Sequence, residues 1–137
     1  MIHGAGIDMA FVPEFRAAMD DGKTRFLETY FTSRERSYCV NHDGTRGAQS
    51  LAARYAAKEA LLKALDGERL GAGPEFRFEY REAEVRNDEH GRPYLLAHGA
   101  LNEYMRGRGI TRTLLSLSHT GDYAIAQVVL DSGPTSF

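Results

Sequence analysis

Apolar and polar residues follow two different periods along this chain, one typical of strands and one of helices. Residues 2–9 form a short, glycine-punctuated stretch that predicts a strand ending near Asp8. Pro13 suits the first turn of a helix, and residues 24–31 predict a second short helix. Thr32 and Glu35 match a capping box, which predicts a further helix start. The first third therefore predicts one strand followed by short helices.

The middle of the chain predicts one long helix, from about residue 48 to residue 66, after a loop-like stretch at 41–47. Alanine and leucine fill a broad apolar face, and Tyr55 and Leu62 form a narrower one. Charged side chains emerge between these two faces; they are Arg54, Lys58, Glu59 and Lys63. A helix covered on two sides is expected beside a cleft or a subunit boundary.

The second half predicts mostly strands. Residues 76–86 alternate in polarity, 88–93 have turn chemistry, and 93–97 resume an extended pattern, so a hairpin is expected. Residues 98–109 predict a helix ending in glycines, and 111–119 should pair with 122–130. With no repeat or long linker, the chain predicts one α+β domain over residues 1–130 and a flexible tail at 131–137.

Composition narrows the class of protein. The chain has 42% hydrophobic and 26% charged residues, as in ordinary folded domains, and its formal charge of −2 argues against nucleic acid as a partner. Basic residues concentrated in the first 54 positions suit either an acidic partner or a solvated surface. Cys39 is the only cysteine, which excludes an intrachain disulfide and favours a packing role in a reducing cytoplasm. No leader or membrane span is apparent, so we expect a cytoplasmic protein.

Four side chains could carry chemistry. Asp8 and Glu59, if folding brings them together, supply the two carboxylates that Mg²⁺ prefers beside substrate phosphates. Lys63 could reach a phosphate at the same metal, or form only an i,i+4 pair with Glu59. His119, at a strand end, could be catalytic or a structural hydrogen-bonding group. Ser118 beside it could bind phosphate or ribose, or satisfy strand-end backbone groups.

The common catalytic motifs are absent. The chain has neither the GxxxxGK[ST] nor the GxGxxG phosphate-binding pattern, and it lacks GxSxG, HExxH and CxxC. The residues alone therefore indicate a domain that handles phosphate and metal. Two alternatives stay open, which are a small esterase using Ser118 and His119, and a non-catalytic module that binds a carrier protein or a nucleotide.

Five segments, taken in order, resemble the holo-(acyl-carrier-protein) synthases, the short phosphopantetheinyl transferases. They are GAGID at 4–8, RFLETYFTSRE at 25–35, LAARYAAKEALLKAL at 51–65, GRPYL at 91–95 and SLSHTGDYAIAQVVL at 116–130. The resemblance runs from residue 2 to about residue 130. It implies a single phosphopantetheinyl transferase domain over 1–130, in which one long central helix packs on an antiparallel sheet.

The resemblance implies transfer of 4′-phosphopantetheine from coenzyme A to a serine of an apo acyl carrier protein, releasing adenosine 3′,5′-bisphosphate. Asp8 and Glu59 match the magnesium ligands, and Lys63 matches the lysine that contacts the phosphates. Either Glu59 or a metal-bound water would be the base, and His119 would hold the coenzyme's phosphates. The other coenzyme-binding positions would be Arg46, Arg54, Gly91, Arg92, Pro93 and Ser118.

The resemblance also implies a homotrimer with active sites between subunits, and docking of an acidic helix of the carrier protein. The matching positions for that docking are Arg16, Met19, Arg25, Phe26 and Tyr55. One position departs from the family pattern, because Glu14 stands near the usual basic residue and Arg16 follows two residues later. Recognition of the carrier is therefore the part in question, and the sequence leaves open fatty acid or polyketide synthesis, Mg²⁺ or Mn²⁺, and free or acylated coenzyme A.

Overall fold

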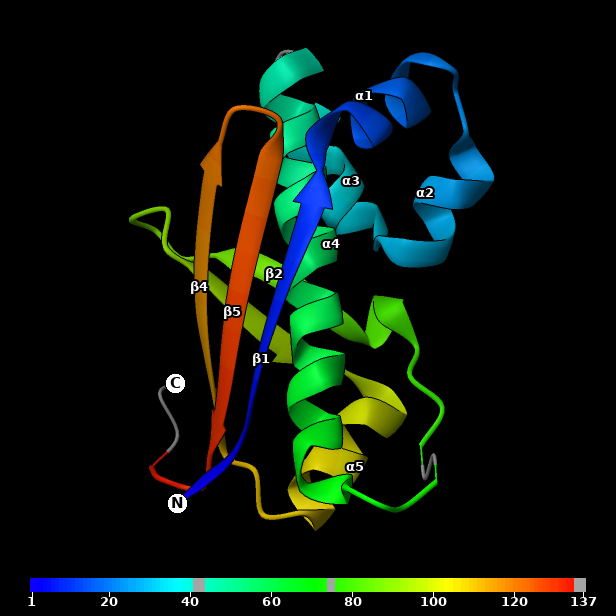
Figure 1. Ribbon diagram of the computed structural model, residues 1–137. Coiled ribbons are helices and arrows are strands. Elements are labelled where there is room, and N and C mark those ends of the chain that lie inside the picture. Colours follow the sequence, from blue (N-terminus) through cyan, green and yellow to red (C-terminus); the bar gives the residue numbers. More distant parts are fainter. Residues whose placement is uncertain (41–43, 74–75, 135–137) are drawn as a thin grey trace.

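A three-stranded antiparallel sheet lies along one long helix (Figure 1). This computed structural model describes residues 1–40, 44–73 and 76–134. The sheet has the order β1-β5-β4, in which β1 is Ile2–Phe11, β4 is Arg112–Thr120 and β5 is Tyr123–Asp131. The long helix, α4, spans Gly44–Asp66 and packs against both β1 and β5. The α+β class and the helix-on-sheet arrangement are as the sequence predicts.

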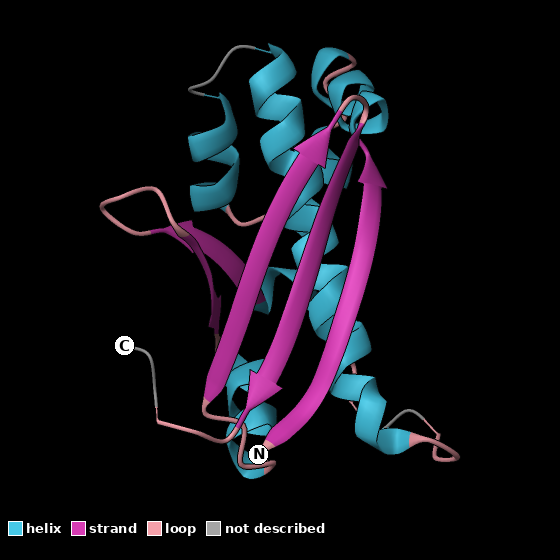
Figure 2. Cartoon of the chain, turned by 60° about the vertical axis from the view of Figure 1, so that its left-hand side comes forward, coloured by secondary structure: helices cyan, strands magenta, loops and turns pink. Residues whose placement is uncertain are grey.

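The smaller elements surround the two ends of α4. The helices α1 (Val12–Asp20), α2 (Thr24–Tyr30) and α3 (Ser33–Val40) gather near its N-terminal half. The hairpin of β2 (Ala83–Asn87) and β3 (Pro93–Ala97) is antiparallel and lies set back beside the edge strand β4 of the main sheet (Figure 2). Two short 3₁₀ turns, η1 (Gly67–Arg69) and η2 (Tyr80–Glu82), and the helix α5 (Gly99–Gly107) complete the fold.

Two glycines allow β1 to lie directly on the backbone of α4. A Cβ atom at Gly4 would overlap the carbonyl oxygen of Ala64, and one at Gly6 would overlap that of Ala60. As residue numbers rise along β1, the contacted residue numbers on α4 fall, so the strand runs antiparallel to the helix. Because alternate strand residues share a face, the next side chain on the α4 side of β1 is that of Asp8. The glycines at positions 4 and 6 thus fix where this carboxylate lies.

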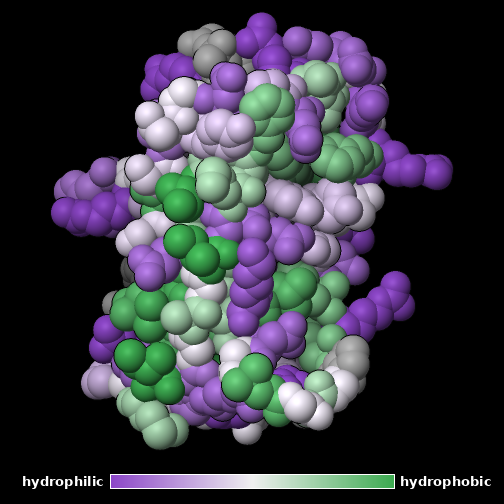
Figure 3. Space-filling view, viewed as in Figure 1, coloured by the Kyte–Doolittle hydropathy of each residue, from purple (hydrophilic) through white to green (hydrophobic). Residues whose placement is uncertain are grey.

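The two faces of the sheet differ in exposure. The inner face of β5 is buried against α4 through Ala124, Ala126, Val128 and Leu130. The outer face exposes large apolar side chains, which are Ile7, Met9, Phe11, Leu114 and Tyr123. Figure 3 shows apolar side chains gathered over these strands. No helix within the described ranges is both long and apolar enough to cross a membrane.

The predicted capping box is present, but the start of the long helix was placed too late. Glu35 N–H donates to Thr32 Oγ1 at 3.1 Å, and Thr32 N–H donates to Glu35 Oε1 at 3.0 Å. Helix α4 begins at Gly44 instead of residue 48, so 44–47 are not loop, while 41–43 lie outside the described residues. A Cβ at Gly47 would lie 2.7 Å from the carbonyl oxygen of Cys39, so this glycine permits close packing of α3 on α4.

The predicted strand at 76–86 was wrong over most of its length, because β2 begins only at Ala83. Residues before it are irregular or form η2, since their alternating aromatic rings pack on other elements. Phe76 stacks on Tyr104 of α5 at 4.5 Å between ring centroids, and Tyr80 lies edge-on to Tyr30 of α2 at 4.8 Å. A period of two here reflects ring packing and not strand pairing.

The lone cysteine is a packing residue. Cys39 on α3 is fully buried in the core. Burial raises the pKa of its thiol, which disfavours the thiolate that a nucleophile requires. The prediction from the sequence agrees with this position.

Candidate functional site

Asp8 and Lys63 meet where β1 crosses α4. Lys63 Nζ lies 3.0 Å from Asp8 Oδ1 and donates a second hydrogen bond to the carbonyl oxygen of Ile7 at 3.0 Å. The Asp8 side chain is 18% exposed and that of Lys63 is 55% exposed. The lysine therefore reaches across to the strand, and its ammonium group is accessible to a ligand.

Glu59 lies one turn before Lys63 on α4 and is held by phenols. Tyr80 Oη donates to Glu59 Oε1 at 2.6 Å, and Tyr55 also hydrogen-bonds the same carboxylate. Burial raises the pKa of Tyr55, and the negative charges of Glu59 and Asp8 raise it further. Both carboxylates thus act on one phenol, which places them in the same neighbourhood. We call Asp8, Glu59 and Lys63 the metal half-site.

The donor set of this half-site suits a hard cation that keeps other ligands. Within the described ranges, no group of three or more His, Cys, Asp or Glu side chains is arranged to hold a metal ion. A closed structural zinc site needs four such ligands, whereas Mg²⁺ takes one or two carboxylates and completes its shell with water and phosphate oxygens. Asp8 and Glu59 therefore fit a magnesium ion that arrives with a phosphate substrate.

A separate cavity of about 360 Å³ gathers most of the predicted coenzyme-binding residues. It lies between the N-terminal half of α4, the β2–β3 turn and the end of β4. Its lining includes Arg46, Arg54, Gly91, Pro93, Ser118 and His119. We call this cavity the coenzyme pocket.

Arg54 supplies a buried positive charge in the coenzyme pocket. Its side chain donates to Ser50 Oγ at 2.5 Å and to Asn87 Oδ1 at 2.7 Å, and its guanidinium lies 4.4 Å from the centre of the Tyr38 ring. Arg54 is only 4% exposed, and its Nε has no hydrogen-bond partner within the described part of the chain. A buried guanidinium with a spare donor suits an anionic group such as phosphate.

The coenzyme pocket is lined by two of the three predicted residues at 91–93 and by both of those at 118–119. Gly91 has a φ of +83°, which favours glycine, and both Gly91 and Pro93 line the cavity. Arg92 between them is exposed, with its guanidinium 3.6 Å from Asp88, and lies outside the lining. Ser118 and His119 point to opposite faces of β4, yet both border the pocket because β4 is an edge strand.

The metal half-site and the coenzyme pocket lie on different sides of one chain. β1 carries Asp8 at one edge of the sheet and β4 carries His119 at the other. On α4, Arg54 and Lys63 are two and a half turns apart, which places them on opposite faces and about 13 Å apart along the axis. None of the three metal half-site residues lines the coenzyme pocket. A ligand that uses both must therefore extend around the helix or lie between two chains.

The predicted carrier-docking positions lie on the first two helices and α4. Arg16 and Arg25 are exposed, Phe26 is 38% exposed, and Met19 is half-buried against the core. Arg16 also pairs with Asp20 at 3.1 Å. Tyr55 differs from the others, because its ring packs at 5.5 Å against Phe15 and its hydroxyl contacts Glu59. Glu14 is exposed on α1 beside this surface.

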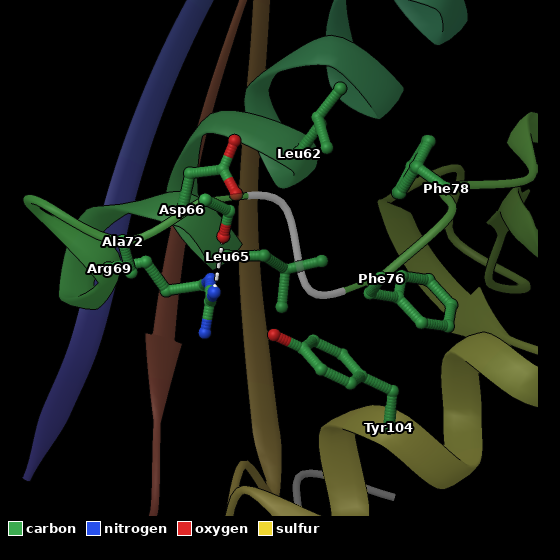
Figure 4. Close-up of a pocket in the computed structure, with 9 residues that line it drawn as sticks. Leu62, Leu65, Asp66, Arg69, Ala72, Phe76, Phe78 and Tyr104 are labelled. Atoms are coloured by element: carbon green, nitrogen blue, oxygen red, sulfur yellow. Dashed lines mark hydrogen bonds between the residues drawn. The ribbon is translucent and has the colours of Figure 1, made fainter.

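A larger cavity, of about 470 Å³, lies beside the C-terminal half of α4 (Figure 4). Leu62, Leu65, Phe76, Phe78 and Tyr104 point into it, and Arg69 bonds the Gly73 carbonyl at its edge. Its mainly apolar lining does not suit a phosphate. The predicted chemistry is thus in the smaller cavity and on the β1 side of α4.

The sequence did not predict several residues that contact the metal half-site or line the coenzyme pocket. Tyr80, the donor to Glu59, was assigned to a strand, and Tyr38, Gln49 and Asn87 of the coenzyme pocket carried no signal. These residues come from separate segments of the chain. Only the tertiary fold brings them together.

Comparisons with known proteins point to one family. Residues 4–128 match the family model of the 4′-phosphopantetheinyl transferase superfamily. A holo-(acyl-carrier-protein) synthase from Geobacter sulfurreducens is 39% identical over 131 residues, covering 96% of this chain and 98% of the relative. One from Nocardia farcinica is 41% identical over 131 residues, covering 95% of this chain and 88% of the relative.

Solved structures show the same fold. The acyl carrier protein synthase of Mycobacterium tuberculosis has a TM-score of 0.76 at 34% identity and covers 97% of this chain and 100% of its own. The holo-(acyl-carrier-protein) synthase of Bacillus anthracis, solved in complex with CoA (3′,5′-ADP), has a TM-score of 0.74 at 33% identity, covering 97% and 99%.

Proposed function

Because the chain belongs to the 4′-phosphopantetheinyl transferase superfamily, we propose that it transfers 4′-phosphopantetheine from coenzyme A to a serine of an apo acyl carrier protein. The observation that carries this proposal is the contact of Lys63 with Asp8 beside Glu59, at the point where β1 lies on α4. Phosphoryl transfer depends chiefly on positioning and on neutralising charge. Two carboxylates that can hold Mg²⁺ and an accessible ammonium group can supply both.

The reaction replaces a phosphoanhydride bond of coenzyme A with a phosphoester bond to serine. The serine oxygen forms a bond to the phosphorus that carries pantetheine, and the pyrophosphate P–O bond of coenzyme A breaks. The bonding electrons leave with adenosine 3′,5′-bisphosphate, whose new charge Lys63 neutralises, while the serine proton goes to Glu59 or to water. The coenzyme pocket would hold the nucleotide end, with Arg54 and His119 at its phosphates.

Asp8 and Glu59 would hold a magnesium ion. When bound, it would neutralise charge on the pyrophosphate oxygens. Lys63 contacts the Asp8 carboxylate, and the hydroxyls of Tyr80 and Tyr55 contact that of Glu59. We place the protein in the cytoplasm, because its single cysteine cannot form an intrachain disulfide and so suits a reducing compartment. We place the transferase domain at residues 1–130.

We further propose a homotrimer with active sites between subunits. The metal half-site and the coenzyme pocket are different surfaces on opposite sides of α4. Joining one to the other in a second chain makes a heterologous contact, the type that builds a closed ring when the rotation between subunits closes. The exposed apolar outer face of the sheet supplies the area that such a ring would bury. Light scattering that shows a monomer at assay concentration would contradict this assembly.

Intact-mass spectrometry tests the function. An apo acyl carrier protein is incubated with this protein, coenzyme A and Mg²⁺, beside samples with EDTA and with the Glu59→Ala variant. We expect the carrier to gain one phosphopantetheine arm, and expect EDTA and Glu59→Ala to prevent the gain. Failure to modify any of several carriers despite coenzyme A binding would favour a binding module. Hydrolysis of simple esters without Mg²⁺ would favour the esterase.

A further inference from the structure

Neighbouring residues of α4 hold opposite ends of one tyrosine. Lys58 Nζ donates to the carbonyl oxygen of Tyr80 at 3.0 Å, and Glu59 Oε1 accepts from the Tyr80 hydroxyl at 2.6 Å. The link between the two contacts is the tyrosine itself. The position of the Glu59 carboxylate is therefore coupled to that of Lys58 through η2.

Lys58 is itself immobilised by a buried carboxylate. Its ammonium lies 2.7 Å from Glu35 Oε1, and both side chains are 0% exposed. Glu35 also accepts from the backbone N–H of Val85 and of Thr32, each at 3.0 Å. A buried ion pair whose remaining lone pairs are satisfied is held in one geometry. The anchor of Tyr80 is thus part of the core.

Aromatic packing fixes the ring of Tyr80 between these two anchors. It stacks on Tyr55 with ring centroids 6.1 Å apart and lies edge-on to Tyr30 at 4.8 Å and to Phe78 at 5.1 Å. A ring packed on three sides presents its hydroxyl in one direction. The phenol O–H is therefore aimed at Glu59 Oε1, to which it donates.

We infer that Tyr80 is a positioning residue, whose hydroxyl fixes the orientation of the Glu59 carboxylate by occupying Oε1. This inference rests on the proposed function, in which Glu59 is a metal ligand. Hydrogen bonds to ligating carboxylates orient them, and their loss typically lowers metal affinity about 10- to 100-fold. Tyr55 bonds the same carboxylate, and the lone pairs that the two hydroxyls leave would bind the metal ion.

The test compares Tyr80→Phe with the matched control Tyr30→Phe. The first change removes the hydroxyl on Glu59, and the second removes a hydroxyl from the adjoining ring but leaves the Tyr80–Glu59 bond in place. Mn²⁺ affinity is measured by electron paramagnetic resonance on protein saturated with coenzyme A, and the Mg²⁺ dependence of transfer is measured in parallel. We expect Tyr80→Phe to lower Mn²⁺ affinity about tenfold and to raise the Mg²⁺ concentration needed for half-maximal transfer by a similar factor. Its melting temperature should match that of Tyr30→Phe, and Tyr30→Phe should keep the parent metal affinity.

Two further variants separate this inference from the proposed function. Adding Tyr80→Phe to Glu59→Gln should change Mn²⁺ affinity no further, because the hydroxyl acts only through that carboxylate. An additive loss, or parent affinity in Tyr80→Phe alone, would overturn the positioning role and leave the transferase proposal intact. Parent Mn²⁺ affinity in Glu59→Ala would overturn the metal assignment itself.

Discussion

Two lysines of α4 form ion pairs of nearly equal length in opposite surroundings. Lys58 pairs with Glu35 at 2.7 Å with both side chains fully buried, and Lys63 pairs with Asp8 at 3.0 Å with its side chain 55% exposed. Burial lowers the pKa of Lys58, although the charge of Glu35 opposes this shift. Both ions of the first pair are therefore desolvated, whereas in the second pair the Lys63 ammonium keeps much of its contact with water.

The difference separates a structural role from a functional one. A buried ammonium with its donors used by Glu35 and the Tyr80 carbonyl cannot bind a substrate. Lys63 can exchange its contact with Asp8 for one with a phosphate, because an exposed pair of this kind contributes only about 0–1 kcal/mol. A third pair, Arg16 with Asp20, is exposed on both sides and completes the series.

Replacing the buried lysine should have the largest effect on stability. Lys58→Met leaves Glu35 buried without its partner, and we expect the free energy of unfolding to fall by about 3–5 kcal/mol. Urea denaturation followed by circular dichroism measures this loss. Lys63→Met is the matched control and should change the same free energy by less than about 1 kcal/mol. Equal losses in the two variants would show that burial does not distinguish the pairs.

Replacing the exposed lysine should instead affect catalysis. Lys63→Met removes a charge from the leaving phosphate, and loss of one such group typically lowers kcat about 100- to 1000-fold. Initial rates of carrier modification under saturating coenzyme A measure the effect. A variant that kept parent kcat but needed more coenzyme A would show that Lys63 only binds the substrate.

The buried carboxylate of Glu84 should also make the stability of the fold depend on pH. Burial alone would raise the pKa of Glu84, but hydrogen bonds from Thr32, Arg86 and His98 lower it to about 2. A carboxylate with a lowered pKa stabilises the fold above its unfolded pKa of about 4.5, and that contribution is lost as pH falls toward about 2. Melting temperatures should drop between about pH 5 and pH 2, and the drop should be smaller in Glu84→Gln. An equal drop in both would assign the acid sensitivity to other groups.

Local patterns in the sequence were sufficient for much of the fold. The capping box at Thr32, the alanine face of α4 and the hairpin of β4 and β5 each depend on neighbouring residues, and the structure has all three. A shared metal site for Asp8 and Glu59, with Lys63 beside it, was a hypothesis from the residue types, and the resemblance matched the same three positions. The packing of Gly4 and Gly6 on α4 is the physical reason that Asp8 reaches Lys63.

The remaining features depend on contacts between distant segments. Glu35 and Lys58 are both charged, so a sequence pattern assigns them to the surface, and only folding shows that each neutralises the other in the core. Tyr80 belongs to a stretch with strand periodicity, yet its ring packs between α2 and α4. The strand order also explains why the predicted residues are divided between the metal half-site and the coenzyme pocket, because β1 and β4 lie at opposite edges of the sheet.

The most exposed pair should show the smallest effect, and only toward the carrier protein. Arg16→Glu replaces the exposed cation near Glu14 with a third acidic side chain, so an acidic helix should dock more weakly, with KM for the carrier rising about tenfold. KM for coenzyme A should stay unchanged. Arg106→Glu, on α5 at the far end of the molecule, gives the same charge change away from the predicted docking surface and is the control (Figure 1). Because rim charges act mainly on association, the effect should shrink as salt rises. An equal rise for both variants would mean that net charge, and not the α1 surface, governs carrier recognition.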